Sequence, residues 1–386
     1  MKKVIVYRNQ LLPPSETFIR QQALALRSWQ ATVVGERLVA NGLDLAGLDV
    51  RLLRNDPSAR LENLRYQLSR WLWQPHAPIA RVLAGLNADL IHVHFGTDAT
   101  DLWPSIRALG RPVLVTLHGY DINIHRAWWE AGHGGLIRRR YPQRLLQLAA
   151  EPMVRFIAVS RAIRDRAIQF GIPSSRLALH HIGVDCNAFH PGPVPVTKRN
   201  RRILFVGRLT EKKGVEHLIR ALLLVRRHVS DAMLVIAGSG PLRPSLLALA
   251  KSLSLPVEFL GAVSSDEVRQ QMQQARVFCL PSITAANGDA EGFGMVLLEA
   301  QACGIPVVSS ARGGAEEGLL DNETGFRVKE AAVDVLAEKL VKLLLDDDLA
   351  ESFSARGAAF VRERFDLRAC TRLLEAIYDH SIQPRS

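Results

Sequence analysis

Two carboxylates, Glu291 and Glu299, flank a Gly-Phe-Gly turn and an apolar run in the stretch EGFGMVLLEA. Glycine lets a backbone approach a ligand closely, and the first N–H groups of a helix attract an anion. If the stretch is helical, eight residues complete about two turns, and both carboxylates lie on one side. Carboxylates accept strong hydrogen bonds from hydroxyls. The pattern indicates a site for a hydroxylated anionic ligand, and the simpler interpretation is a capped helix carrying two acids.

Two cations, Arg208 and Lys213, follow an apolar run at 202–207. The end of a parallel strand is the ligand-binding edge of a sheet, where a guanidinium fork and an ammonium can clamp a diphosphate. A solvated loop is the alternative. Gly238 follows the next run in a Gly-Ser-Gly sequence and predicts a turn that approaches a ligand closely. Without a third glycine it is not a dinucleotide fingerprint.

The first half of the chain offers three histidines near strand ends. His118 follows an apolar run and precedes a glycine, so it is predicted to face the ligand edge. His92 and His94 alternate within a run and therefore share one face. With no third metal ligand in the pattern, packing and hydrogen bonding are favoured over metal binding. Ser15 is expected to be the N-cap of the first helix, and Glu16 suits the helix dipole.

Apolar runs of strand length alternate with helical patterns along the whole chain, which predicts an α/β fold with two Rossmann-like, doubly wound domains facing a central cleft. The runs are 4–7, 31–35, 90–95, 112–117, 156–160, 202–207, 233–238, 257–261, 277–281 and 306–310. A proline-rich segment at 190–200 separates the halves. The expected domains are 1–190 and 191–366, and a last helix begins near residue 367.

The charge is uneven: residues 1–190 hold 24 Lys/Arg against 14 Asp/Glu, and residues 191–386 hold 25 against 24. A basic half predicts an anionic partner, which can be a phosphorylated substrate, a phospholipid or a nucleic acid. No nucleic-acid-binding module is recognisable. Arginines beside aromatic residues at 60–73 and 136–141 favour contact with a membrane surface, and packed helices are the alternative.

The location is predicted to be cytoplasmic, with peripheral contact at the inner face of the plasma membrane. The first residues read as a strand rather than a signal peptide, and no apolar run reaches the length of a membrane-spanning helix. The four cysteines are scattered without C-x-x-C spacing, which suits a reducing compartment and predicts no zinc site.

Taken together, these motifs resemble the retaining family 4 glycosyltransferases over nearly the whole chain. The similarity is strongest in the second half, in Gly207-Arg208-Leu209, Lys213-Gly214, the Gly238 turn and the Glu291 to Glu299 stretch. The first half is similar to exopolysaccharide enzymes of the colanic-acid and amylovoran type, through SETFI at 15–19, HVHF at 92–95 and HGYD at 118–121. The resemblance implies the GT-B fold, in which a C-terminal helix, here 367–386, returns to the first domain.

The resemblance also implies a reaction and a set of roles. A nucleotide-diphosphate sugar binds to the second domain, and transfer retains the anomeric configuration without a metal or other cofactor. The implied catalytic residues are His118, Glu291, Arg208 and Lys213. The implied donor-binding residues are Arg208, Lys213, Gly238, Gly292, Phe293, Gly294 and Glu299, where Glu299 takes the ribose hydroxyls. The implied acceptor-side residues are Ser15, Glu16, Thr17 and Asp121.

The implied acceptor is a glycan or a lipid-diphosphate-linked oligosaccharide, in exopolysaccharide or surface polysaccharide synthesis. Two alternatives share the pattern: a nucleotide-sugar epimerase of the same fold, and a non-catalytic module that binds anionic glycans or membranes. The chain departs from many relatives at 9–15, where they carry a Gly-Gly loop, and at Ile182, where they carry an asparagine.

Overall fold

The computed structural model describes residues 1–40, 42–53 and 60–383 of the chain. Two compact units divide it: Met1–Gly183 together with Leu367–Ser386, and Val184–Asp366. The change of unit, expected at residue 190, lies at 183/184 in this division. The Val184 N–H donates to the Phe365 carbonyl (2.7 Å), which ties the segment after Gly183 to the second unit.

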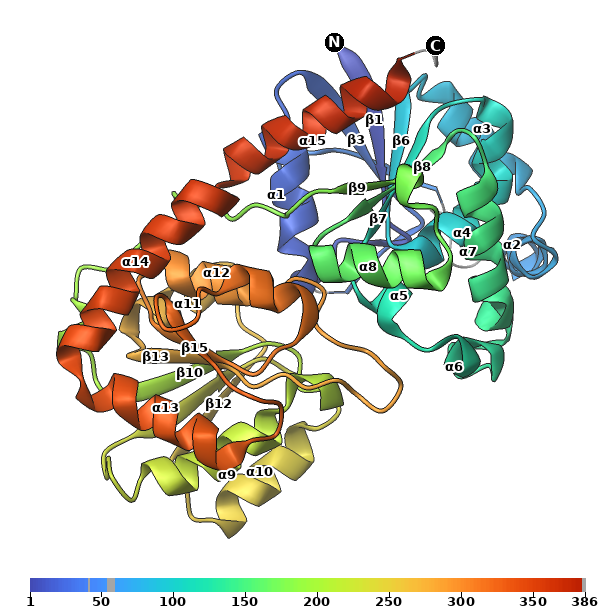
Figure 1. Cartoon of the computed structure of the whole chain (residues 1–386). Coiled ribbons are helices and arrows are strands. Elements are labelled where there is room, and N and C mark those ends of the chain that lie inside the picture. Colours follow the sequence, from blue (N-terminus) through green and yellow to red (C-terminus); the bar gives the residue numbers. More distant parts are fainter. Residues whose placement is uncertain (41, 54–59, 384–386) are drawn as a thin grey trace. The chain divides into compact units, whose positions relative to one another are not determined.

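The first unit is built on a seven-stranded parallel sheet with the order β5-β3-β1-β6-β7-β8-β9 (Figure 1). Its strands are β1 (Lys2–Tyr7), β3 (Trp29–Gly35), β5 (Asp49–Leu52), β6 (Leu90–His94), β7 (Val113–Leu117), β8 (Val154–Ala158) and β9 (Leu177–Leu179). A small pair, β2 (Gln10–Leu11) and β4 (Arg37–Leu38), lies beside it. β6 and β7 are buried at every position, as their continuous apolar sequence predicts.

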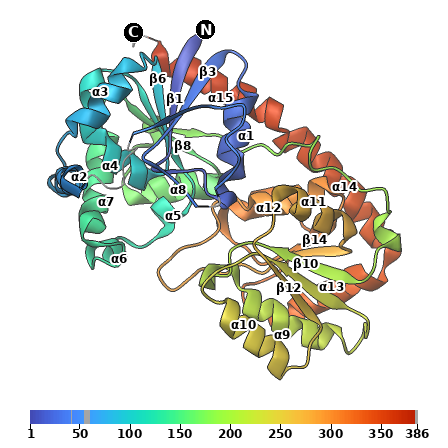
Figure 2. The same ribbon diagram turned by 180° about the vertical axis from the view of Figure 1, so that it is seen from behind.

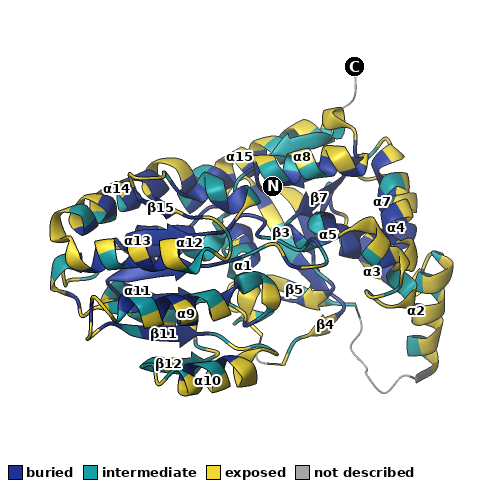
Figure 3. Ribbon diagram, turned by 60° about the horizontal axis from the view of Figure 1, so that its bottom comes forward, coloured by how far each residue is buried: buried dark blue, intermediate teal, exposed yellow. Residues whose placement is uncertain are grey.

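Helices cover both faces of this sheet. They are α1 (Thr17–Ala25), α2 (Arg60–Leu72), α3 (Ala77–Gly85), α4 (Gly96–Ile106), α5 (Tyr120–Asn123), α6 (Arg126–Glu130), α7 (Tyr141–Ala150), α8 (Arg161–Phe170) and α15 (Leu367–Ile382). α4 is buried along its whole length, whereas α2 is largely exposed (Figure 3).

The last helix, α15, returns to the first unit as expected and lies beside α1 (Figure 2). Its Tyr378 is buried in the core formed by β1, β3 and α1. Its Glu375 accepts hydrogen bonds from the backbone N–H groups of residues 27–29 at 2.7, 2.6 and 3.2 Å. The His180 ring bonds to the Cys370 carbonyl (2.8 Å). These contacts explain why a helix so distant in sequence belongs to the first sheet.

The second unit contains a six-stranded parallel sheet with the order β12-β11-β10-β13-β14-β15. Its strands are β10 (Arg202–Val206), β11 (Met233–Ala237), β12 (Val257–Gly261), β13 (Val277–Leu280), β14 (Val307–Ser309) and β15 (Gly325–Arg327). Its helices are α9 (Val215–Val225), α10 (Arg243–Ser252), α11 (Ser265–Gln274), α12 (Met295–Ala302), α13 (Val333–Leu345) and α14 (Asp347–Phe365). The predicted two doubly wound α/β units are therefore confirmed.

Candidate functional site

The strand order of the second sheet reverses between β10 and β13, and ligands of such sheets bind where the carboxyl ends of those strands diverge. Backbone contacts join the loops at this edge: the Leu209 N–H donates to the Ser239 carbonyl (2.9 Å). Gly238 has φ +145°, and a Cβ there would lie 1.9 Å from the Gly207 carbonyl oxygen. The Gly238 backbone thus packs closely on the Gly207 loop, which only glycine permits, and its approach to a ligand stays a prediction.

At this edge Lys213 and Glu291 form a buried ion pair, with 2.6 Å between Nζ and Oε1. Lys213 ends the short helical turn η6 (Glu211–Lys213) after β10, and Glu291 lies in the loop after β13. Ser282 donates to the same Glu291 oxygen (2.8 Å). A parallel pair, Lys212 with Asp289, lies beside them at 3.0 Å. Two neighbouring strand ends therefore hold two lysines and two carboxylates together.

The charges at this edge fix the protonation state of Glu291. Burial alone would raise the pKa of its carboxyl, but the charges of Lys213 and Lys212, with hydrogen bonds from Lys213 and Ser282, lower it to about 2. Glu291 is therefore a carboxylate at any physiological pH. Because it is bound by an ammonium and a hydroxyl, it is a poor nucleophile and a poor base.

The other two predicted charged residues of the second unit do not join this pair. The Arg208 side chain is exposed, and no hydrogen bond or ion pair connects it to another described residue. Glu299 lies in the second turn of α12, half-buried, and its carboxylate likewise has no hydrogen-bond partner among the described residues. Burial raises the pKa of Glu299 to about 7. Both side chains retain their hydrogen-bonding capacity for a ligand.

The helical interpretation of the Glu291–Glu299 spacing is wrong. α12 begins at Met295, and Gly294 at its N-cap has φ +75°, a left-handed conformation. Glu291 and Gly292 therefore precede the helix, and the two carboxylates are not stacked on successive turns. Phe293 was expected to hold the sugar with its backbone, and its side chain is buried against Phe365 (ring centroids 5.5 Å apart). Only its backbone can serve a ligand.

In the first unit the loop after β7 carries His118, and Asp121 fixes that loop. Asp121 is fully buried and accepts backbone hydrogen bonds from Gly96 (2.8 Å), His118 (3.0 Å) and Gly119 (3.0 Å). Burial raises the pKa of Asp121 to about 6 although these bonds oppose the rise. Its placement differs from the acceptor-side position that was expected, because its oxygens serve backbone groups and are not exposed.

His118 is half-buried, and its ring stacks on that of His94 at the end of β6 (ring centroids 5.2 Å apart). His118 Nε2 is 3.0 Å from His94 Nδ1, and the rings of His92 and His94 lie 4.4 Å apart, on one face as predicted. His92 bonds to Tyr378 and Thr116, both at 2.6 Å. Burial, with the neighbouring cationic and imidazole groups, lowers the pKa of His94 and His118 well below the ordinary value. The histidines are neutral hydrogen-bonding groups.

Arg8, directly after β1, binds two buried carboxylates. Its guanidinium donates to Glu16 (2.8–3.1 Å) and to Asp98 of α4. The predicted capping by Ser15 is wrong: Pro14–Glu16 form a 3₁₀ turn, α1 starts at Thr17, and no side chain caps either helix. Ser15 is exposed and Thr17 half-buried, so both can reach a ligand, whereas Glu16 is committed to Arg8.

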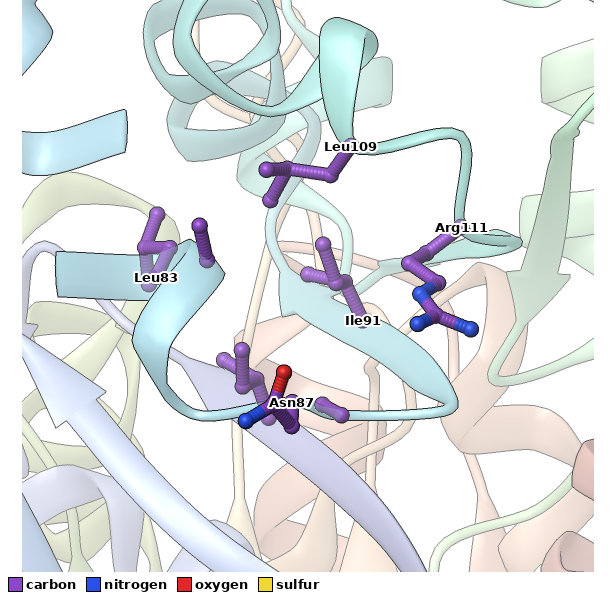
Figure 4. A pocket seen from close by; sticks show the side chains of 8 residues that line it. Leu83, Asn87, Ile91, Leu109 and Arg111 are labelled. Carbon is purple, nitrogen blue, oxygen red and sulfur yellow. The ribbon is translucent and has the colours of Figure 1, made fainter. Parts of the chain in front are cut away.

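A small cavity of about 190 Å³ lies in the first unit, between the end of α3 and the starts of β6 and β7 (Figure 4). Leu83, Asn87, Ile91, Leu109 and Arg111 are among its lining residues. These residues lie at the amino ends of the strands, the edge opposite to the one that carries His118. The cavity is therefore separate from the candidate site.

Within residues 1–40, 42–53 and 60–383, no cluster of three potential metal ligands is present, and none of the four cysteines forms a disulfide. No described helix combines the length and the apolar character that a membrane span requires. Sequence reasoning missed Arg8, Asp98 and Ser282. Each follows a strand of its sheet directly or within a few residues, so the strand-end rule that selected His118 could also have selected them.

Two doubly wound units with the last helix returned to the first define the GT-B class of glycosyltransferases, and solved GT-B structures superpose on the chain. HepE from Anabaena, solved with UDP and glucose, matches with a TM-score of 0.79 at 21% identity, over 98% of this chain and 100% of that one. The chain belongs to the family 4 glycosyltransferases. Residues 19–188 match the family model described as Glycosyltransferase Family 4, and residues 190–360 match Glycosyl transferases group 1.

Two curated relatives illustrate the range of this similarity. The putative colanic acid biosynthesis glycosyltransferase WcaL of Escherichia coli is 29% identical over 85% of both chains. A GDP-mannose-dependent α-(1-6)-phosphatidylinositol monomannoside mannosyltransferase of Mycobacterium tuberculosis is 37% identical over 215 residues. That match spans 53% of this chain and 56% of the mycobacterial protein.

Proposed function

We propose that this chain transfers a hexose from a nucleotide-diphosphate sugar to a glycan acceptor, with retention of configuration, in exopolysaccharide or surface polysaccharide synthesis. The observation that carries the proposal is the buried Lys213–Glu291 pair with Ser282, at the carboxyl edge where the second sheet reverses. It lies within residues 190–360, the part that matches the group 1 glycosyltransferases. The colanic-acid relative supports the polysaccharide context.

The donor diphosphate is assigned to the loop after β10 and to the start of α12. When the sugar–phosphate bond breaks, negative charge grows on the leaving diphosphate, and fixed cations and backbone N–H groups stabilise it. Lys213 carries three N–H donors, of which one is used on Glu291. Arg208 has an exposed guanidinium on the same loop. These cations supply the charge that a metal supplies elsewhere, so we expect no metal requirement.

Glu291 orients the sugar rather than attacking it. Its carboxylate is held by Lys213 and Ser282 and can accept hydrogen bonds from sugar hydroxyls, together with the backbone of residues 292–294. With no carboxylate free to act as nucleophile in this proposal, the acceptor approaches from the side of the leaving group, and a phosphate oxygen takes its proton. Glu299, without a partner of its own, binds the ribose hydroxyls.

His118 of the first unit is assigned to the transferred sugar, and exposed Ser15 with half-buried Thr17 to the acceptor. The acceptor is a lipid-diphosphate-linked oligosaccharide, presented at the inner face of the plasma membrane. Two observations support this proposed acceptor. Residues 1–190 carry an excess of basic charge, and the name of the mycobacterial relative includes phosphatidylinositol monomannoside.

A thermal-shift screen against UDP, GDP, ADP and their sugars tests the proposal first. A ligand at about 100 times its Kd stabilises the folded chain by roughly 2.7 kcal/mol, which is readily measured. The Arg208→Ala variant should lose most of the thermal shift, because it lacks the guanidinium proposed to bind the diphosphate. It should still fold, because the Arg208 side chain is exposed and its removal leaves no buried charge. Transfer is then followed by NMR with and without EDTA. Absence of a shift with every nucleotide would contradict the proposal, and free sugar epimers without an acceptor would indicate an epimerase.

A further inference from the structure

Helix α2 (Arg60–Leu72) turns its polar side toward the protein and its apolar side toward solvent. Tyr66 is 3% exposed and donates to the buried carboxylate of Glu36, which also accepts from Tyr7 (2.8 Å). Four residues later, Arg70 donates to the buried Asp101 of α4. Tyr66 and Arg70 thus mark the inward face, and their partners are polar.

The outward face of α2 consists of large apolar side chains. They are Leu61 (76% exposed), Leu64 (68%), Leu68 (51%), Trp71 (56%) and Leu72 (50%). At about 100° per residue these five positions fall within an arc of about 100°, centred on the side opposite to Tyr66 and Arg70. Figure 3 shows the helix as mainly exposed. A contiguous apolar stripe of this kind marks an interaction surface.

The helix is held firmly to the first unit, so the stripe is a fixed platform. Trp73 Nε1, just after the helix, donates to the Thr100 carbonyl of α4 (2.7 Å). Arg144 of α7 donates to the Trp71 carbonyl (2.8 Å). With Tyr66 and Arg70, these bonds fasten the second half of α2 through polar contacts and leave the leucines outward.

Exposed cations border the stripe. Arg65 lies on α2 between Leu64 and Leu68 and is exposed. The short helix η3 (Leu136–Arg140) lies next to the end of α2. One guanidinium, that of Arg144, donates both to the Trp71 carbonyl of α2 and to the Ile137 carbonyl of η3 (3.4 Å). Arg139 and Arg140 of η3 are exposed. Glu62 is the acidic residue of α2, and its Oε1 lies 3.0 Å from His76 Nε2.

We propose that the outward stripe of α2 (Leu61, Leu64, Leu68, Trp71 and Leu72) docks the first unit on an anionic lipid bilayer, with Arg65, Arg139 and Arg140 at the headgroups. Leucines and tryptophan on one face, with arginine at its border, form the composition of an interfacial helix. A two-fold contact between copies would bring the same cations together, whereas anionic lipid neutralises them. This inference rests on the proposed transfer to a lipid-linked acceptor and gives the membrane contact a location.

Co-sedimentation with vesicles tests the stripe directly. The full chain is mixed with vesicles of 70% phosphatidylcholine and 30% phosphatidylglycerol at low salt. We expect the fraction of protein that sediments with the vesicles to be about tenfold lower, or less still, for the L61S/L64S/L68S variant than for wild type. The matched control is L223S/L345S/L373S, which removes three leucines exposed by 37%, 50% and 63% on other helices and should bind like wild type. Thermal melting of both variants verifies that they are folded.

The headgroup contribution is measured separately. R65Q/R139Q/R140Q should weaken binding to the anionic vesicles, remove most of its salt dependence, and leave binding to pure phosphatidylcholine unchanged. The proposal is overturned if wild type does not bind anionic vesicles, or if the control triple loses as much binding as the stripe variant. A concentration-dependent dimer in gel filtration that L61S/L64S/L68S dissociates, with no vesicle binding, would show that the stripe pairs two copies instead.

Measurements of nucleotide binding distinguish a failure of the docking proposal from a failure of the proposed transferase function. Thermal shifts with UDP and GDP, measured on the same samples without vesicles, should be equal for wild type and L61S/L64S/L68S. Nucleotide binding without vesicle binding would refute the docking stripe and leave the transferase intact. Vesicle binding without any nucleotide shift would refute the transferase and leave the stripe standing.

Discussion

Lys213 Nζ lies 2.6 Å from Glu291 Oε1, and the two side chains are only 13% and 8% exposed. The pair joins the loop after β10 to the loop after β13, the two strands between which the order of the sheet reverses. A ligand that binds Lys213 therefore also encounters Glu291. In the proposed complex, this one contact would link the position of the diphosphate to the orientation of the sugar.

Removing Lys213 should affect both stability and catalysis. Lys213→Ala leaves Glu291 buried without its main partner, which costs roughly 3–5 kcal/mol of unfolding free energy. We also expect turnover to fall by about 100-fold or more, because a cation aimed at the leaving diphosphate is lost. Urea unfolding and steady-state kinetics on the verified donor measure the two effects.

The double variant Lys213→Met/Glu291→Gln separates the effect on stability from the effect on turnover. It removes both charges, so it should recover most of the lost stability while remaining inactive. Kinetics like wild type in Lys213→Ala would contradict the diphosphate assignment. Failure of the double variant to recover stability would show that the two residues are not energetically coupled.

Glu299 should make stability depend on pH. Burial raises its pKa from 4.5 to about 7, so the folded chain binds this proton more tightly than the unfolded chain. The free energy of unfolding therefore falls as pH rises from about 4.5 to about 7, by at most about 3 kcal/mol. Glu299→Gln should remove this fall, which urea unfolding at pH 5 and pH 8 measures. An unchanged pH dependence would mean that the Glu299 carboxyl is not strained by burial.

The same carboxyl should link nucleotide binding to pH. Ribose hydroxyls donate to the ionised form, so affinity should increase as pH rises through about 7, with release of a proton. In Glu299→Gln binding should be weaker, and the pH dependence and proton release that come from this carboxyl should be absent. Calorimetric titration in two buffers of different ionisation enthalpy detects the proton. A carboxylate that serves the acceptor instead would change acceptor KM alone.

The ten apolar runs expected as strands are strands in the structure, because parallel strands covered on both faces read as continuous apolar sequence. The short strands β5, β9 and β15, all at sheet edges, were missed. β5 illustrates the reason: Asp49 and Arg51 alternate with Val50 and Leu52, so half of its side chains are polar and exposed. An edge strand of three or four residues carries too little pattern to be recognised.

The sequence singled out some residues of the candidate site but not the contacts between them. Glu291 and Lys213 were singled out from their neighbours in sequence, yet their pairing depends on β10 lying beside β13, which only the strand order reveals. The bond between Arg8 and Asp98 depends in the same way on β1 lying beside β6. The two-turn interpretation of Glu291 and Glu299 failed because Gly294 starts the helix later than the apolar pattern suggests.

His94 should determine which nitrogen of His118 carries the proton. His94 Nε2 is buried and has no hydrogen-bond partner among the described residues. Leaving this nitrogen unprotonated costs less free energy than burying an N–H group without an acceptor. His94 then carries its proton on Nδ1 and donates it to His118 Nε2, 3.0 Å away. His118 is left with a proton on Nδ1, ready to donate to a sugar hydroxyl. Long-range ¹H–¹⁵N spectra should show this tautomer, unchanged between pH 5 and 8.

Substitution of His94 tests this positioning role. His94→Phe removes the donor, so the His118 spectrum should change to a mixture of tautomers, and kcat should fall by about tenfold. His94→Asn keeps an N–H donor and should restore part of both. An Nε2-protonated His118 in wild type would refute the assignment, and so would loss of activity in His94→Phe without any change of tautomer.

Asp121 should be irreplaceable by its amide. Its two oxygens accept three backbone N–H bonds, from Gly96, His118 and Gly119, and the residue is fully buried. In Asp121→Asn one oxygen becomes an NH₂ group facing backbone donors, so unfolding free energy should fall by roughly 2–3 kcal/mol. Asp89, which accepts one backbone bond from Lys3 (2.8 Å) near the surface, is the control, and Asp89→Asn should cost less than about 1 kcal/mol. Equal losses in the two variants, by urea unfolding at pH 8, would show that Asp121 does not fix the His118 loop.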